Sequence, residues 1–566
     1  MQKYNWKILE YNAQDLIRIQ TEFGISRPTA MILRSRGLFD NDIERFFRPK
    51  LKDLSDPFEM PDMEIAVKRI WKAIEHNEKI LVHGDFDTDG ITSTALLTWV
   101  LKENGARVDA FLPHRINDGY GLTTESIDKG VDGHTLLITV DCGITSNEGA
   151  SYAKSKNIDL IITDHHQPGP ELPDALAIIN PKIHDHLKSW QVLAGVGVAF
   201  KLSHGLLKYA RDNNMGGDKP DLREGMDLVA LGTVADIVPL TNENRCMVKY
   251  GMMVLSNRQR PGIHALCESS GIEDSISTDD IAFKLAPRIN AAGRMGDALD
   301  ALTLLQSSNI RDAYEMADQL NIYNSDRQSI EESVYQEAVD QIQLLNPKNL
   351  NSIVVAGKNW HRGVIGIVAS RLTQEYFRPC IVLSEEDGVL QGSGRSVEGV
   401  NLVTTLECCK ENLQRFGGHP MAVGLSLEAD RLEVFRKDFE RNVQHSCSGT
   451  DTLTPSLCLD GKVDICELEL QFFREMYQLQ PFGHKNPQPK FQINSVNCHR
   501  VYPAGENHSR GVFYDRYGSR MNFIFFGMKP CDYPPPPWDI VAIADLNTYN
   551  GVTKPQLQIL DIRSSD

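Results

Sequence analysis

Three short apolar runs in the sequence each end in residues that can bind a metal ion. They read KILVHGDFD, TLLITVDCG and IDLIITDHH, and helix-like stretches separate them. This alternation predicts βαβ units and a parallel sheet. The carboxyl ends of parallel strands meet at one crevice, where ligands bind. The sequence therefore predicts an α/β fold with one site at these strand ends.

The length and the changes of pattern along the chain predict several domains. A chain of 566 residues is too long for a single domain. We expect a mixed N-terminal cap region over residues 1–75, an α/β domain over 76–300, a long connecting helix over 301–348 and a second α/β domain over 349–447. Short β-rich runs broken by proline and glycine predict a β-barrel over 455–566.

Composition excludes some classes of protein. Lys and Arg number 59 and Asp and Glu 76, so the net charge is −17, which argues against a uniformly basic, polyanion-coating protein. A local basic groove stays compatible with this charge. We expect no membrane partner, because no apolar stretch approaches the length of a membrane span and the first residues lack a signal-peptide pattern. The 11 cysteines lack C-x-x-C spacing, which fits a cytoplasmic location.

Four carboxylates and one imidazole are the main candidate metal ligands. Asp87 and Asp89 follow the first apolar run, Asp141 the second and His165 the third, while Asp236 follows LVALGTVA, which we interpret as a further strand. Four negative charges would balance two divalent cations. Oxygen-rich ligands without thiolate favour Mn²⁺ or Mg²⁺ over structural zinc. Two such ions are typical of phosphoester hydrolysis, so phosphodiester chemistry is the leading class.

These motifs also have other interpretations. An EF-hand beginning at Asp85 would need glutamate at its twelfth position, where the chain has Leu96. A solvated turn capping a helix remains possible for this segment taken alone. Gly195-Val196-Gly197 lacks the third glycine of a dinucleotide fingerprint and is interpreted as tight packing. Cys142 has anionic neighbours that raise a thiol pKa, and it too is interpreted as packing.

Several basic residues are candidates for binding a polyanionic substrate. Arginines beside glycines or at loop ends can bind phosphate through two parallel hydrogen bonds. They are Arg288, Arg294, Arg362 and Arg395. His419 lies in a GGH motif, where glycines would let the backbone approach a ligand closely.

The motifs HGDFDTDG, DCG and DHH resemble those of the DHH phosphoesterase superfamily. Further segments resemble its bacterial single-strand-specific 5′-to-3′ DNA exonucleases: APRINAAGRM, HRGVIGIVASRL, GSGRS, GGHPMAVG and PFGHKNPQPKF. The resemblance runs from about residue 75 into the C-terminal barrel. It implies a DHH domain, a connecting helix, a DHH-associated domain and an OB-fold. Where these relatives commonly read P-F-G-x-G-N-P, this chain has Lys485 before the asparagine.

The resemblance also implies roles for individual residues. The metal ligands would be His83, Asp87, Asp89, Asp141, His165 and Asp236, with Asp141 bridging two cations. Asp85 would adjust a metal-bound water or support the ligands, Asp164 would orient His165 by a hydrogen bond, and His166 would face the scissile phosphate. His419 would contact substrate phosphate, Arg115 the 5′ phosphate, and Tyr120 would stack on a base.

The resulting hypothesis is a metal-dependent nuclease that releases mononucleotides from the 5′ end of single-stranded DNA. The resemblance implies service in DNA repair and recombination, a helicase and a single-strand-binding protein as partners, and a monomer. One alternative is a phosphodiesterase acting on nano-RNA or cyclic dinucleotides. Another is a DNA-binding scaffold without catalysis. The β-rich C-terminal region argues against the first alternative, and the intact ligand set argues against the second.

Overall fold

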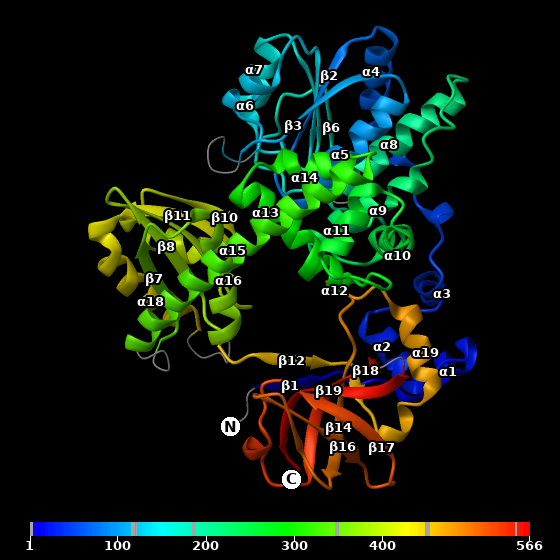
Figure 1. The fold of residues 1–566 in the computed structure, drawn as a ribbon, viewed down its shortest axis with the longest axis vertical. Coiled ribbons are helices and arrows are strands. Elements are labelled where there is room, and N and C mark those ends of the chain that lie inside the picture. Colours follow the sequence, from blue (N-terminus) through cyan, green and yellow to red (C-terminus); the bar gives the residue numbers. More distant parts are fainter. Residues whose placement is uncertain are drawn as a thin grey trace. The chain divides into compact units, whose positions relative to one another are not determined.

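The computed structural model describes residues 4–114, 119, 121–183, 188–345, 350–447, 453–549 and 552–565. The chain divides into two units that are described separately. One comprises Met1–Lys7 and Asn324–Cys458, and the other Ile8–Tyr323 and Leu459–Asp566. The predicted α/β architecture with a C-terminal β-rich region is confirmed (Figure 1).

The larger unit contains a five-stranded, fully parallel sheet in the order β3-β2-β4-β5-β6. Its strands are β2 (Lys79–Gly84), β3 (Arg107–Phe111), β4 (Leu136–Val140), β5 (Asp159–Thr163) and β6 (Ala177–Ile179). Side chains alternate between two cores: Ile80 and Val82 pack with α4 (Met63–Glu75), α5 (Thr88–Glu103) and α8 (Gly195–Asp212). Leu81 packs with α6 (Thr124–Gly130) and α7 (Asn147–Ser155) on the other face. Both faces are covered, which is why these strands read as continuous apolar runs.

A helical region follows the sheet. It contains α9 (Met226–Ala235), α10 (Asn242–Asn257), α11 (Pro261–Ser269), α12 (Thr278–Asp280), a π-helix over Ile281–Leu285, α13 (Ala286–Met295) and α14 (Ala298–Gln306). The predicted long helix is present as α15 (Ile310–Leu344), which runs from one unit into the other.

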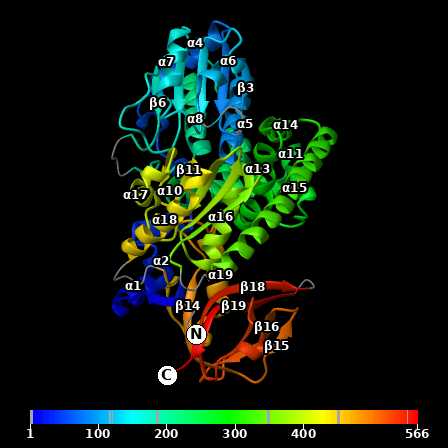
Figure 2. The ribbon, with the colours of Figure 1, turned by 90° about the vertical axis from the view of Figure 1, so that its left-hand side faces the viewer.

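The C-terminal strands form a barrel. The order is β13-β14-β18-β19-β17-β16-β15, and a second pairing of β14 with β16 closes it (Figure 2). The strands are β13 (Gly461–Lys462), β14 (Lys490–Cys498), β15 (Tyr502–Ala504), β16 (His508–Tyr514), β17 (Arg520–Phe525), β18 (Trp538–Tyr549) and β19 (Val552–Ser564). Helix α19 (Leu470–Leu479) packs into the barrel core.

The N-terminal helices share that barrel core. Buried residues of α1 (Ala13–Phe23), α2 (Arg27–Ser35) and α3 (Asn41–Phe47) belong to the same apolar cluster as Phe472, Phe491 and Trp538. Helix α4, by contrast, packs in the core of the parallel-sheet domain. The first 75 residues therefore contribute to two cores, although they were expected to form one cap region.

The smaller unit is built on a mixed sheet in the order β10-β11-β9-β8-β7. Its strands are β7 (Ile353–Lys358), β8 (Cys380–Glu386), β9 (Val389–Arg395), β10 (Arg415–His419) and β11 (Ala422–Glu428), and only β7 and β8 are parallel. Helices α16 (Arg362–Tyr376), α17 (Leu402–Glu407) and α18 (Leu432–Cys447) accompany it. Strand β1 (Asn5–Ile8) pairs with β12 (Ser456–Leu459).

Candidate metal centre

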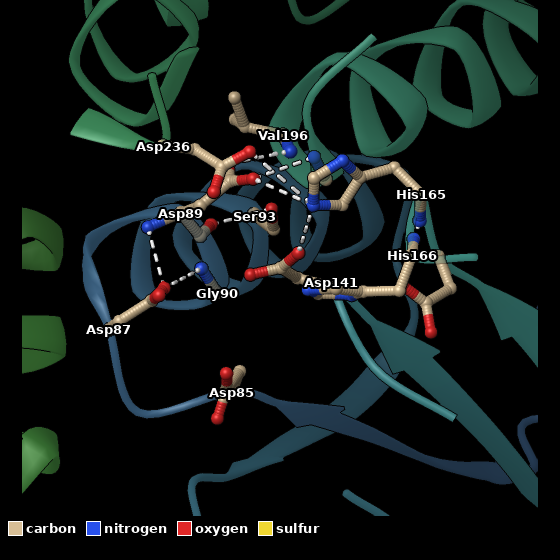
Figure 3. Close-up of polar contacts among 12 residues, drawn as sticks. Asp85, Asp87, Asp89, Gly90, Ser93, Asp141, His165, His166, Val196 and Asp236 are labelled. Atoms are coloured by element: carbon tan, nitrogen blue, oxygen red, sulfur yellow. Dashed lines mark hydrogen bonds and ion pairs between the residues drawn. The ribbon is translucent and has the colours of Figure 1, made fainter. Parts of the chain in front are cut away.

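The carboxyl ends of β2, β4 and β5 bring the predicted acidic and imidazole groups together. Asp87 is the N-cap of α5, directly after β2, and its Oδ1 accepts hydrogen bonds from the backbone N–H groups of Asp89 (3.0 Å) and Gly90 (3.1 Å). Asp141 follows β4 and His165 follows β5. Because the strands are parallel neighbours, their ends meet at one edge of the sheet. The predicted convergence is confirmed for these residues (Figure 3).

His165 lies at the centre of the cluster. Its Nε2 is 3.2 Å from Oδ1 of Asp141, 3.4 Å from Oδ2 of Asp236 and 3.8 Å from Oδ2 of Asp89. Among the residues that the structure describes, three overlapping sets of side chains have ligand atoms within 4.8 Å of one another. They are Asp85 with Asp87 and Asp141, Asp89 with His165 and Asp236, and Asp141 with His165 and His166. Asp141 and His165 each belong to two of these sets.

Burial makes this cluster electrostatically unfavourable in the absence of cations. Desolvation, and then the neighbouring carboxylates, raise the pKa values of Asp89 and Asp141 well above the ordinary range. The same causes raise the pKa of Asp236 to about 7. Burial and the neighbouring His166 lower the pKa of His165 to about 3, which keeps its imidazole neutral and able to ligate a metal.

Several atoms of the cluster that could ligate a metal are buried without a hydrogen-bond partner among the described residues. They are both ring nitrogens of His165, Oδ1 of Asp141 and Oδ2 of Asp236. Buried polar atoms normally have partners, and exceptions mark functional sites or absent ions. An oxygen-rich set with one or two imidazoles fits hard divalent cations such as Mn²⁺ or Mg²⁺.

The N-terminus of α8 takes part in the centre. The backbone N–H groups of Gly195 and Val196 donate to the two carboxylate oxygens of Asp89 at 2.6 and 2.9 Å. Figure 3 shows Val196 beside Asp89. A Cβ atom on Gly195 would lie 2.5 Å from Oδ1 of Asp141. The interpretation of this glycine segment as tight packing was therefore incomplete, because Gly195 also makes room for a candidate ligand and orients Asp89.

Asp164 orients His166 rather than the ring of His165. Its Oδ1 lies 2.7 Å from Nδ1 of His166 and accepts the backbone N–H groups of His165 and His166. The predicted hydrogen bond to the His165 imidazole is wrong, since neither of that ring's nitrogens has such a partner among the described residues. Burial lowers the pKa of His166, but the Asp164 carboxylate outweighs this effect and the pKa rises to about 9. His166 is therefore a cation at neutral pH.

His83 and Asp236 differ from the expectations in their surroundings. His83 lies within β2, fully buried, with its ring centroid 5.3 Å from that of Phe111 and its Nδ1 3.7 Å from Sγ of Cys142. It belongs to none of the three ligand sets found among the described residues. Asp236 follows helix α9, so the prediction of a strand before it was wrong. An isolated apolar run does not distinguish a strand from a buried helix.

Burial, and then the neighbouring carboxylates, raise the pKa of Cys142 well above the usual range, in agreement with a packing role.

The candidate phosphate-binding residues are spread over both units. Arg288 and Arg294 lie on α13, where Arg288 donates to Oδ1 of Asn321 (3.1 Å) and to the carbonyl of Lys284 (2.8 Å). Arg288 is thus inside a helix, away from the predicted loop end. The candidates Arg115 and Tyr120 lie outside the described residues.

The smaller unit carries the other three candidates. Arg362 begins α16 and pairs with Glu386, and Arg395 ends β9, where it donates to Oγ of Ser393 and to the carbonyl of Gly394. His419 is exposed at the end of β10. Their roles stay predictions.

Sequence reasoning missed Asn290. Its Oδ1 accepts hydrogen bonds from the backbone N–H (2.8 Å) and the hydroxyl (2.9 Å) of Thr88, which lies between two candidate ligands. A Cβ on Gly293, one turn further along α13, would lie 2.6 Å from the carbonyl of Phe86. The motif APRINAAGRM thus contacts the acidic loop directly. The motif itself was the signal in the sequence, although its arginines are its more conspicuous candidates for binding phosphate.

In the part of the chain that the structure describes, no helix is long and apolar enough to cross a membrane.

Three family models match the chain. The N-terminal domain of the DHH family matches residues 79–233, the DHHA1 domain matches residues 349–445, and the RecJ OB domain matches residues 459–561.

Curated relatives and solved structures agree with these matches. The single-stranded-DNA-specific exonuclease RecJ of Bacillus subtilis is 35% identical over all of this chain and 71% of that protein. RecJ of Escherichia coli is 38% identical over 76% of this chain and 78% of that protein. The crystal structure of Thermus thermophilus RecJ with Mn²⁺ matches with a TM-score of 0.86 at 27% identity, covering all of this chain and 80% of that one. These similarities, together with the strand-end cluster, show that the chain belongs to the RecJ family of the DHH superfamily.

Proposed function

We propose that this protein hydrolyses single-stranded DNA from its 5′ end to mononucleotides, in a reaction that depends on two divalent cations, Mn²⁺ or Mg²⁺. The observation that carries the proposal is the largely buried cluster of acidic and imidazole groups beside the strand ends: Asp85, Asp87, Asp89, Asp141, His165 and Asp236. Relatives named single-stranded-DNA-specific exonucleases support the substrate, and RecJ structures with Mn²⁺ and with Mg²⁺ support the cations.

Five residues of the chain would bind the cations. Asp87, Asp89, Asp141, His165 and Asp236 would hold the cations, and Asp141 would be shared between them. Divalent cations at such a site supply Lewis acidity and a water molecule of lowered pKa. Helix α8 fixes the carboxylate of Asp89 through two backbone N–H groups, so this ligand is already oriented.

His166 is suited to bind the scissile phosphate. Its imidazole is cationic at neutral pH because of Asp164, and about one third of its side-chain surface (36%) is exposed. A protonated imidazole can donate to a phosphate oxygen and stabilise charge that develops during in-line displacement. Asp85, which is buried beside the ligands, would support them or adjust the attacking water.

Other residues would guide the strand. Arg288, Arg294, Arg362, Arg395 and His419 are candidates for contacts with substrate phosphates, and Arg115 and Tyr120 for the 5′ end. A barrel of the OB class adds a surface for single strands, which such folds bind through base stacking and backbone electrostatics. We further propose that the protein works in the cytoplasm as a monomer. Its partners there would be a helicase and a single-strand-binding protein, in DNA repair and recombination.

The test uses purified full-length protein with Mn²⁺ and three substrates: 5′-labelled single strands, matching duplexes and dinucleotides. We expect release of labelled mononucleotide from single strands and little attack on blunt duplexes. Preference for dinucleotides would instead support a small-molecule phosphodiesterase, and absence of turnover with retained DNA binding would support a scaffold. A 3′-labelled strand is the matched control, because 5′-end attack leaves its label in long products until late in the reaction.

A further inference from the structure

The residue after the candidate ligand Asp236 has an unfavourable backbone conformation. Ile237 has φ of +58°, in the left-handed region. A β-branched residue rarely adopts this region, because its side chain crowds the backbone there. Ile237 is also 71% exposed, so side-chain packing does not hold the conformation. Other contacts must therefore keep the segment after Asp236 in place.

The conformation of this segment rests on a loop from a distant part of the sequence. Nδ1 of His484 lies 2.8 Å from the carbonyl oxygen of Ile237. The carbonyl can only accept, so the ring nitrogen donates. In return, the backbone N–H of Leu240 donates to the carbonyl of His484 at 2.9 Å. These two hydrogen bonds bracket the segment 237–240, which leads away from Asp236.

The loop that carries His484 is itself firmly held. Gly483 and Asn486 form a backbone bridge, and Lys485 between them has φ of +61°, so the tight turn forms although lysine replaces the glycine common in relatives. The fully buried Asn486 side chain donates to the carbonyls of Leu479 (3.0 Å) and Pro481 (2.7 Å).

Arg245 of α10 holds the C-terminal end of α19, from which this loop departs, against the parallel-sheet domain. Its guanidinium donates to the carbonyls of Gln478 (2.9 Å), Leu479 (3.0 Å) and Gln480 (2.9 Å). The loop therefore offers a rigid support at the junction between α19 and the barrel.

We propose that His484 is a positioning residue, which holds the backbone at Ile237 so that the Asp236 carboxylate faces His165 and binds a divalent cation. The proposal rests on the proposed function, in which Asp236 is a ligand. In this way the PFGH motif (residues 481–484), which leads into the barrel, becomes part of the metal centre. It sets the affinity of the parallel-sheet domain for its cation. Residues that orient metal ligands commonly change metal affinity by about 10- to 100-fold when removed.

The test measures Mn²⁺ binding to the full-length chain by electron paramagnetic resonance, which counts free Mn²⁺ without any turnover. We expect His484→Ala to weaken the binding of one Mn²⁺ by about 10-fold, at the lower end of the range for such residues. His484→Asn should retain most of the affinity, because its amide N–H can take the place of the Nδ1 donor. His508→Ala is the matched control: Nδ1 of His508 also bonds a backbone group, Gly527 N–H at 3.0 Å, but within the barrel.

A second substitution tests whether His484 acts through Ile237. Ile237→Asn replaces a β-branched residue by one that tolerates the left-handed region, so the segment depends less on its support. The loss caused by His484→Ala should therefore be smaller in the Ile237→Asn background. Thermal unfolding without metal, measured on each variant, separates a general loss of folding from a loss of affinity.

The outcomes distinguish the two proposals. If the wild-type chain binds no Mn²⁺, the proposed function fails. If the wild type binds Mn²⁺ and His484→Ala binds it equally well, only the positioning role fails. Equal losses in His484→Ala and His484→Asn, or an unchanged loss in the Ile237→Asn background, would likewise overturn the role of the Nδ1 hydrogen bond.

Discussion

Replacing Asp236 by asparagine should stabilise the protein when divalent cations are removed. Oδ2 of Asp236 is buried and has no hydrogen-bond partner among the described residues. Burial and the nearby Asp87 raise its pKa to about 7. An ionised carboxylate at this position therefore opposes folding in the metal-free protein, and a neutral amide of the same shape avoids that cost.

The magnitude follows from the pKa. A rise from the ordinary value of 3.8 to about 7 corresponds to roughly 4 kcal/mol of unfavourable free energy once the group is fully ionised. The folded protein keeps the proton to higher pH than the unfolded chain, so this group makes stability fall as pH rises from 3.8 through about 7. About 2.5 kcal/mol of that loss should fall between pH 5 and pH 8. For a domain of roughly 150–250 residues, the range that includes the parallel-sheet domain, about 2.5 kcal/mol corresponds to a shift of about 5–10 °C in the unfolding midpoint.

The assay is thermal unfolding in EDTA at pH 5 and pH 8. The wild type should lose midpoint temperature over this range, and Asp236→Asn should lose less and be more stable than wild type at pH 8. Addition of Mn²⁺ should reverse the order, because the variant lacks a ligand. Asp212→Asn, at an exposed aspartate at the end of α8, is the control for loss of one charge. A variant no more stable than wild type at pH 8 without metal would refute the reasoning.

Three further predictions concern other parts of the molecule. Asp141→Ala should abolish hydrolysis while binding of single strands, measured by fluorescence anisotropy, stays within a few-fold; near-normal turnover would contradict its role as a shared ligand. Asp164→Asn should lower the pKa of His166 from about 9 to about 6.5 or below, which NMR of the metal-free protein can follow. The pair of Asp164 and His166 stabilises the folded protein below pH 6.5, and this stabilisation is lost as pH rises through about 9. The variant should lack this pH-dependent stabilisation. Glu243→Gln should cost about 3–5 kcal/mol in chemical denaturation, because Lys201 would stay buried without its carboxylate; a loss under 1 kcal/mol would argue against the ion pair.

The convergence of the candidate ligands at the strand ends could be predicted because their positions follow from local pattern. An apolar run long enough for one strand, followed at once by Asp or His, places that side chain at the edge of the sheet. Parallel pairing of β2, β4 and β5 then brings Asp87, Asp141 and His165 together. The long helix α15 was equally predictable, since helical periodicity continues through its whole length.

Contacts between distant segments were not predictable in this way. Asp164 has two neighbouring histidines in the sequence, and only the path of the chain after β5 decides that its Oδ1 meets the ring of His166. Asn290 reaches Thr88 across about 200 residues because α13 packs on the start of α5. No local pattern distinguishes such an asparagine from an exposed one.

The sequence by itself determined which residues are candidates for the chemistry, because ligand type, strand pattern and charge are local properties of the chain. Tertiary structure alone decided how those residues are held: the N-terminus of α8 on Asp89, the His484 loop beside Asp236, and N-terminal helices in the core of a barrel more than 400 residues later. These contacts depend on the relative placement of packed elements, which burial of apolar surface fixes without regard to distance along the chain.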